Sequence, residues 1–164
     1  MAILTINIIV DLKQVLNIDK FSTRNRPLLL VKAAERYVQF LQDRYITYAL
    51  GGGTWPPLKE ETIKRKERRG VASDPTAILL ESEDLFNNIK VRRRGNTLYV
   101  GYVRNVAHFR HPSVTRLVTI HAKGQGRNPV RRIMALPDDA TRKQMVEDIR
   151  RAYNAEIQRN KRVR

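Results

Sequence analysis

A long apolar stripe that ends at three consecutive glycines is the feature that most constrains the fold of this chain. Thr23 or Asn25 can cap a helix, and Pro27 suits its first turn. Apolar side chains then recur at intervals of three or four residues, at Leu30, Ala33, Ala34, Tyr37, Leu41, Tyr45 and Tyr48. Gly51, Gly52 and Gly53 end the pattern because glycine favours neither helix nor strand. The sequence therefore predicts a main helix of about 25 residues.

Three further helical segments are expected. Residues 59–69 carry an exposed helix with a Glu-Lys pair at the favourable i,i+4 spacing, and residues 81–88 hold one or two helical turns. Asp138 and Asp139 open the last helix, where carboxylates stabilise the positive N-terminal end. Its apolar stripe consists of Met145, Ile149, Tyr153 and Ile157.

Alternating apolar residues predict the strands. Residues 3–10 form one strand, and residues 89–94 and 98–104 flank a Gly-Asn-Thr turn in a hairpin pattern. A further strand is expected at residues 115–121. The predicted fold is α+β, with the long N-terminal helix and the C-terminal helix packed on a small, mostly antiparallel sheet that contains a hairpin.

The length of 164 residues predicts one domain, residues 1–164, with a basic C-terminal tail at about residues 159–164. Without cysteine, the chain has neither disulfides nor thiolate metal sites. Its apolar runs fall short of the roughly 20 residues that span a bilayer, and the N-terminus lacks a secretory signal. We therefore expect a soluble protein that is made in a cytosol and has no membrane partner.

Catalytic and metal-binding patterns are weak. His108 and His111 with His121 lack an acidic residue to complete a ligand set, and the loop at residues 124–127 (Gly-Gln-Gly-Arg) lacks the Gly-Lys-Ser/Thr ending of a P-loop. The paired carboxylates stand where helix starts would use them as caps, at Glu81, Glu83 and Asp84 and at Asp138 and Asp139. We expect no enzyme activity, no metal and no cofactor.

Charge is the most unusual property of this sequence. The net charge is +16, and residues 85–137 contain no acidic residue. Arginine dominates this span, and its planar fork binds phosphate or carboxylate through two hydrogen bonds. The candidate channel-facing or partner-facing residues are Arg92, Arg93 and Arg94 in the hairpin, with Arg127, Arg131 and Arg132 further along. The span indicates either nucleic-acid binding or a solvated basic rim that meets an acidic neighbour.

Several segments occur together in a characteristic order. They are Trp55-Pro56-Pro57-Leu58, the basic stretch 62–66, Ile78 to Leu85, Asn88 to Val91, Leu98 to Gly101, Ile120-His121-Ala122-Lys123-Gly124 and Pro129 to Met134. This order resembles the virion-morphogenesis or tail-completion family of tailed bacteriophages, best known from Mu-type contractile-tailed phages, over roughly residues 27–155. Two positions depart from the family pattern: Glu83 replaces a usual glycine, and Arg132 replaces a proline.

The resemblance implies a structural virion protein of the phage neck that completes or terminates the tail tube and enables head-tail joining. It implies a homo-oligomeric ring, six-fold in the family, assembled in the cytoplasm of the bacterial host. The implied partners are the tail tube and sheath proteins, the head-proximal connector and DNA in the channel. The candidate interface residues are Tyr37, Tyr45, Trp55, Leu58 and Leu85, and Trp55 suits either a core anchor or a ring-interface hot spot. The alternative function is a basic nucleic-acid-binding protein.

Overall fold

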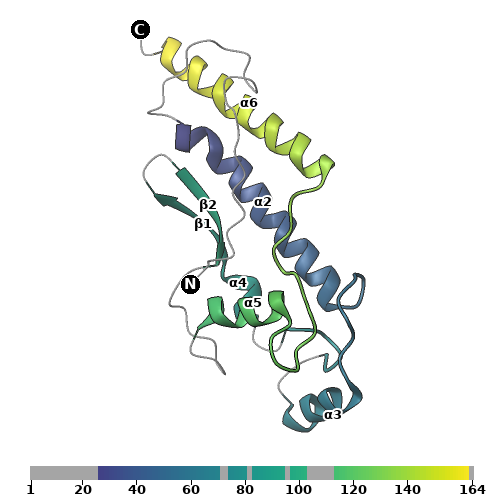
Figure 1. Cartoon of the computed structure of the whole chain (residues 1–164). Helices are drawn as coiled ribbons and strands as arrows, with labels where there is room; N and C mark the ends of the chain where they lie inside the picture. Colours follow the sequence, from purple (N-terminus) through teal and green to yellow (C-terminus); the bar gives the residue numbers. More distant parts are fainter. Residues whose placement is uncertain (1–25, 71–73, 81–82, 95–96, 103–112, 163–164) are drawn as a thin grey trace. The chain divides into compact units, whose positions relative to one another are not determined.

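A computed structural model describes residues 26–70, 74–80, 83–94, 97–102 and 113–162, so the strand expected at residues 3–10 lies outside the described residues. The elements are α2 (Arg26–Ala49), α3 (Glu60–Arg69), α4 (Asp84–Asn87), β1 (Ile89–Arg94), β2 (Thr97–Tyr102), α5 (Val114–Lys123) and α6 (Asp139–Arg162), as drawn in Figure 1. Two residues connect β1 to β2, and the two strands pair as an antiparallel hairpin. The α+β class, with long helices near both ends of the described chain and a hairpin between them, is confirmed.

The long helix α2 forms where the apolar stripe predicted it. Its buried side chains are Leu29, Ala33, Ala34, Tyr37, Leu41, Tyr45 and Ala49. These positions recur every three or four residues and therefore lie on one face of the helix. The helix ends before Gly51, whose φ of 86° is a conformation that glycine adopts without strain.

The exposed helix α3 is also confirmed. Glu60 and Lys64 form the expected ion pair, with the Lys64 Nζ 2.7 Å from a Glu60 carboxylate oxygen. Acidic residues stand in its first turn and basic residues in its last turn, which suits the helix dipole. The helix ends at Arg69, before Gly70.

The hairpin places alternate side chains on opposite faces, as its pattern predicted. Ile89, Val100 and Tyr102 are buried, whereas Tyr99 is 37% exposed. The short helix α4 leads into this hairpin and buries Leu85. The apolar face of the hairpin therefore belongs to the core.

Residues 114–123 form the helix α5, so the expected strand at 115–121 is wrong. Ser113 caps the helix, since its hydroxyl oxygen accepts a hydrogen bond from the Arg116 backbone N–H at 3.3 Å. At the other end, Gly124 takes a left-handed conformation with φ of 64°. Val114, Val118 and His121 are buried at helical spacing. Caps and packing outweigh the strand preference of the β-branched residues in this segment.

The last helix, α6, starts as expected beside Asp138. The Asp138 Oδ1 accepts a hydrogen bond from the Thr141 backbone N–H at 2.7 Å, and this bond lowers the pKa of the Asp138 carboxyl. Met145 and Ile149 are buried, so the predicted stripe faces the interior in this part of the helix. The helix continues to Arg162, which places most of the expected basic tail at residues 159–164 within α6.

The chain gathers into two compact units, each made of separate stretches of sequence. Among the described residues, one unit lies within 41–90 and 102–135, and the other lies within 26–40, 91–101 and 136–162. In the second unit, Arg36 binds Asp148 through two hydrogen bonds of 2.5 and 3.2 Å and thereby joins α2 to α6. The expectation of a single domain over residues 1–164 stays a prediction.

Candidate functional site

The Trp-Pro-Pro-Leu turn is anchored in an aromatic cluster. Trp55 is buried, and its ring meets the rings of Tyr45 and Tyr48 edge-on, at centroid distances of 5.4 and 5.6 Å. Such T-shaped pairs stabilise a core beyond the area that they bury. The next two residues, Pro56 and Pro57, are exposed. Trp55 thus anchors the core and holds the two prolines at the surface.

A buried arginine joins this turn to the loop after α5. The Arg131 Nη2 donates a hydrogen bond to the Pro56 carbonyl oxygen at 3.0 Å, and the Arg131 backbone N–H donates to the His121 carbonyl oxygen at 2.8 Å. Arg131 is 4% exposed and His121 is 7% exposed. Among the described residues, the Arg131 Nε and the His121 Nδ1 have no hydrogen-bond partner. Each of these two buried side chains therefore has a nitrogen atom that could still form a hydrogen bond.

Burial lowers the pKa of both groups. It lowers the pKa of the Arg131 guanidinium from its ordinary high value. Burial, and then the charge of Arg131, lower the pKa of His121 to about 4. At neutral pH the site therefore contains a charged guanidinium beside a neutral imidazole.

Residues 77–79 are fixed by donors from two helices. The buried Lys66 of α3 donates from its Nζ to the Ala77 carbonyl oxygen at 2.5 Å. The Tyr45 hydroxyl of α2 donates to the Leu79 carbonyl oxygen at 2.7 Å. Burial raises the pKa of Tyr45, so its hydroxyl keeps the proton that it donates. These two bonds connect the segment 77–79 to α3 and to α2.

These segments enclose a cavity of about 570 Å³. It is lined by Pro56, Pro57, Leu58, Lys59, Thr62, Arg65, Lys66, Arg69, Leu79, His121, Gly126, Arg127, Asn128, Pro129 and Arg131. Six of these side chains are lysine or arginine, and none is aspartate or glutamate. In a cleft, such one-sided charge focuses the electrostatic potential and attracts anions.

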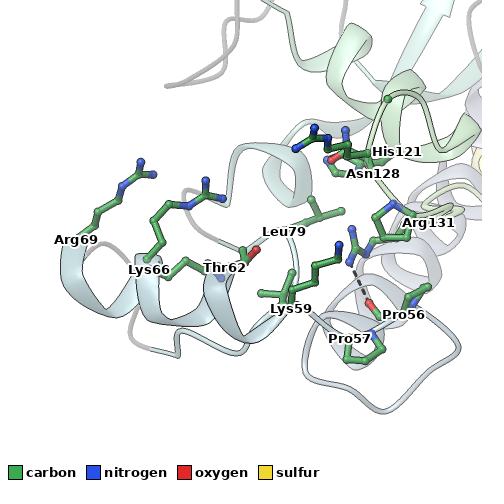
Figure 2. A pocket seen from close by; sticks show the side chains of 15 residues that line it. Pro56, Pro57, Lys59, Thr62, Lys66, Arg69, Leu79, His121, Asn128 and Arg131 are labelled. Carbon is green, nitrogen blue, oxygen red and sulfur yellow. Dashed lines mark hydrogen bonds between the residues drawn. The ribbon is translucent and has the colours of Figure 1, made fainter.

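The cations approach the cavity from two sides. Figure 2 shows Lys66 and Arg69 on α3, with Lys59 just before the helix, and Arg131 across the cavity from them beside the neutral His121. Arginine and lysine donors at such spacing bind phosphate or carboxylate groups. The arrangement is suited to holding an anion.

The predicted interface residues lie mostly in the core. Tyr37 and Tyr45 are 1% and 0% exposed, and Trp55 and Leu85 are 6% and 2% exposed. These four side chains therefore pack inside their own chain, and their role at an interface stays a prediction. Leu58 is half-buried and lines the cavity.

The predicted basic residues separate into different environments. Arg127 and Arg131 line the cavity, whereas Arg132 is exposed and is not among the lining residues. Arg92 and Arg93 are exposed on β1, and the side chain of the neighbouring arginine, Arg94, lies outside the described residues. The structure thus assembles a basic site from part of the predicted set.

The sequence analysis missed the contribution of α3. Lys59 at the N-cap of α3, and Arg65, Lys66 and Arg69 within the helix, line the cavity. The intervals from Arg65 to Arg69 and from Lys66 to Arg69 are four and three residues, so these side chains are neighbours on the helix surface. This spacing was visible in the sequence. Without the fold, nothing in it connected these residues to the loop at residues 126–131.

No family model, curated protein or solved structure matches this chain. The site is therefore interpreted from its own geometry. No group of three or more His, Asp or Glu side chains in the described residues could hold a metal ion. Of the helices that the structure describes, none combines the length and the apolar character needed to cross a membrane.

Proposed function

We propose that this chain is a structural protein of the phage neck, which completes or terminates the tail tube and enables head-tail joining. The observation that carries the proposal is the meeting of three resembling segments around Arg131. This residue belongs to the Pro129–Met134 segment, and it binds Pro56 of the tryptophan turn and His121 of the Ile120–Gly124 segment. Because these three segments contact one another through Arg131, packing gives a physical reason for their joint occurrence in the sequence.

The backbone at Glu83 also supports the proposal. Glu83 has φ of 57°, in the left-handed region that residues other than glycine rarely adopt. This is the position where the resembling family has a glycine. The local fold therefore calls for the residue type that the family pattern contains.

The proposed assembly is a homo-oligomeric ring, six-fold by resemblance, between the tail tube and sheath proteins and the head-proximal connector. Since the aromatic candidates are buried, the ring contacts would involve other apolar residues. Large exposed apolar side chains are Leu50 and Val130 in one unit, and Leu28, Tyr99 and Leu136 in the other. Apolar contacts of this kind can hold subunits together against their like charge.

Deletion of the gene in the phage that encodes this chain tests the proposed role. We expect filled heads and finished tails that do not join, with infectivity restored by the gene supplied in trans. Electron microscopy of lysates would count the particles. Normal virions, or a lysate without any tails, would refute the neck assignment.

The alternative is a nucleic-acid-binding protein, and the acid-free span of residues 85–137 favours it. The two functions differ in their response to salt. Rising ionic strength screens repulsion between subunits of charge +16 and favours a ring held by apolar contacts, whereas it releases protein from nucleic acid. Light scattering of nuclease-treated protein across a salt series distinguishes them: a complex that falls to monomer as salt rises supports the alternative.

A further inference from the structure

The cavity beside α3 holds more positive charge than the fold requires. Lys66 and Arg131 each bind a backbone carbonyl, at Ala77 and Pro56. Lys59, Arg65 and Arg69 are exposed at the same cavity. Like charges that gather around one cavity repel each other, so their placement costs stability unless an anion enters.

A second observation points to a ligand. Arg131 and His121 are more than nine-tenths buried and line the cavity, and their Nε and Nδ1 atoms lack partners among the described residues. A buried donor without an acceptor is unfavourable. An oxygen anion in the cavity would supply an acceptor to the Arg131 Nε–H.

The other lining residues favour a peptide over nucleic acid. Leu58, Leu79 and three prolines give the cavity apolar walls, and no Phe, Tyr or Trp is among its described lining residues. Proteins bind single strands largely by stacking the bases on aromatic side chains. An acidic side chain offers a carboxylate for the arginines and methylene groups for the apolar walls.

We propose that this cavity binds a segment of a neighbouring protein that is rich in Asp and Glu side chains. This proposal rests on the proposed neck function, because that function places a protein of charge +16 in contact with other virion proteins. Binding is measured on the purified chain alone. A failure to bind the peptide would leave the deletion phenotype unchanged. A failure of the deletion test would equally leave the measured binding unchanged.

The probe is a short fluorescein-labelled peptide of alternating Glu and Leu, with a Gln and Leu peptide as the neutral counterpart. Fluorescence anisotropy at about 0.15 M salt limits non-specific attraction. We expect the Glu peptide to bind and the Gln peptide not to bind. The triple variant Lys59→Gln, Arg65→Gln, Arg69→Gln removes exposed cavity cations and should weaken binding at least about tenfold, since each charged hydrogen bond contributes appreciably.

The matched control removes the same charge elsewhere in the same unit. Arg68, Arg116 and Lys123 are exposed and are not among the lining residues. Their triple substitution by Gln should weaken binding by less than about threefold, because only the long-range attraction changes. All six exchanged side chains are exposed, so both variants should remain folded, and circular dichroism checks this.

Three results would overturn the proposal. Equal losses in the two triple variants would mean that binding follows net charge alone. Displacement of the peptide by millimolar inorganic phosphate would identify a phosphoryl site. A single-stranded oligonucleotide that binds more tightly than the peptide, and loses its binding in the cavity variant alone, would identify nucleic acid as the occupant.

Discussion

Exchange of Glu83 for glycine should increase the free energy of unfolding. Glu83 precedes α4 with φ of 57°, and its side chain is exposed and makes no capping hydrogen bond. Its carbonyl oxygen accepts the Asn87 backbone N–H at 2.8 Å, which fixes the backbone in this position. The substitution therefore removes a strained Cβ and no capping hydrogen bond.

The expected gain follows from two opposing terms. The left-handed conformation costs about 1–2 kcal/mol in a residue with a Cβ. Glycine gains conformational freedom in the unfolded chain, which offsets about 0.5–1 kcal/mol of this. The net stabilisation of Glu83→Gly is about 0.5–1 kcal/mol, or about 1–4 °C in Tm for a chain of this size.

Urea unfolding followed by circular dichroism measures this difference. Glu83→Ala is the control, because it removes the carboxylate but keeps the Cβ, and its stability should remain within about 0.5 kcal/mol of the parent. An equal gain in the alanine and glycine variants would attribute the effect to the lost charge. A loss of stability in the glycine variant would refute the argument from backbone strain.

Two further predictions concern buried polar groups in the same unit. Tyr45→Phe should lower the free energy of unfolding by about 1–3 kcal/mol, because it removes the buried hydrogen bond to the Leu79 carbonyl oxygen; thermal unfolding measures the loss. His121 has a pKa of about 4, below its ordinary value, so the unfolded chain takes up a proton first as the pH falls. Stability should decrease below about pH 6.5 by up to about 1.4 kcal/mol per unit until about pH 4, measured by urea unfolding.

Each of these predictions has a matched control. Tyr48→Phe also removes a hydroxyl from a ring that contacts Trp55, but this hydroxyl forms no hydrogen bond with another described residue, so its effect should be smaller. Equal losses in the two tyrosine variants would contradict the role of the hydrogen bond. His121→Gln should show a shallower decline in acid than the parent chain, and identical pH profiles would contradict the role assigned to this imidazole.

The helices and the hairpin could be predicted because their local signals agree with their packing. In α2 the apolar spacing coincides with the buried face, and in the hairpin the alternation coincides with the pleat. α5 gave contradictory signals. Its β-branched residues favour a strand, while Ser113 before it and Gly124 after it are helix caps. The caps decide the outcome, since they satisfy the end groups of a helix whose buried face also fits the core.

The cavity could not be predicted, because its walls are distant in the sequence. Pro56 and Arg131 are 75 residues apart, yet a hydrogen bond joins them. The aromatic residues were assigned to an interface because a sequence does not reveal how much core the chain needs. Tyr45 and Trp55 pack against each other, so both rings belong to the core of their own chain.

The fate of neighbouring arginines shows why a charge pattern alone does not locate a surface. After α5 the chain runs without helix or strand, and successive side chains point to opposite sides: Val130 and Arg132 are exposed, while Arg131 and Ile133 are buried. The buried Arg131 connects its own segment to the tryptophan turn, whereas Val130 and Arg132 point to solvent. Arg131 thus has two roles. Its hydrogen bond to the Pro56 carbonyl oxygen supports the fold, and its guanidinium supplies positive charge to the cavity that it lines.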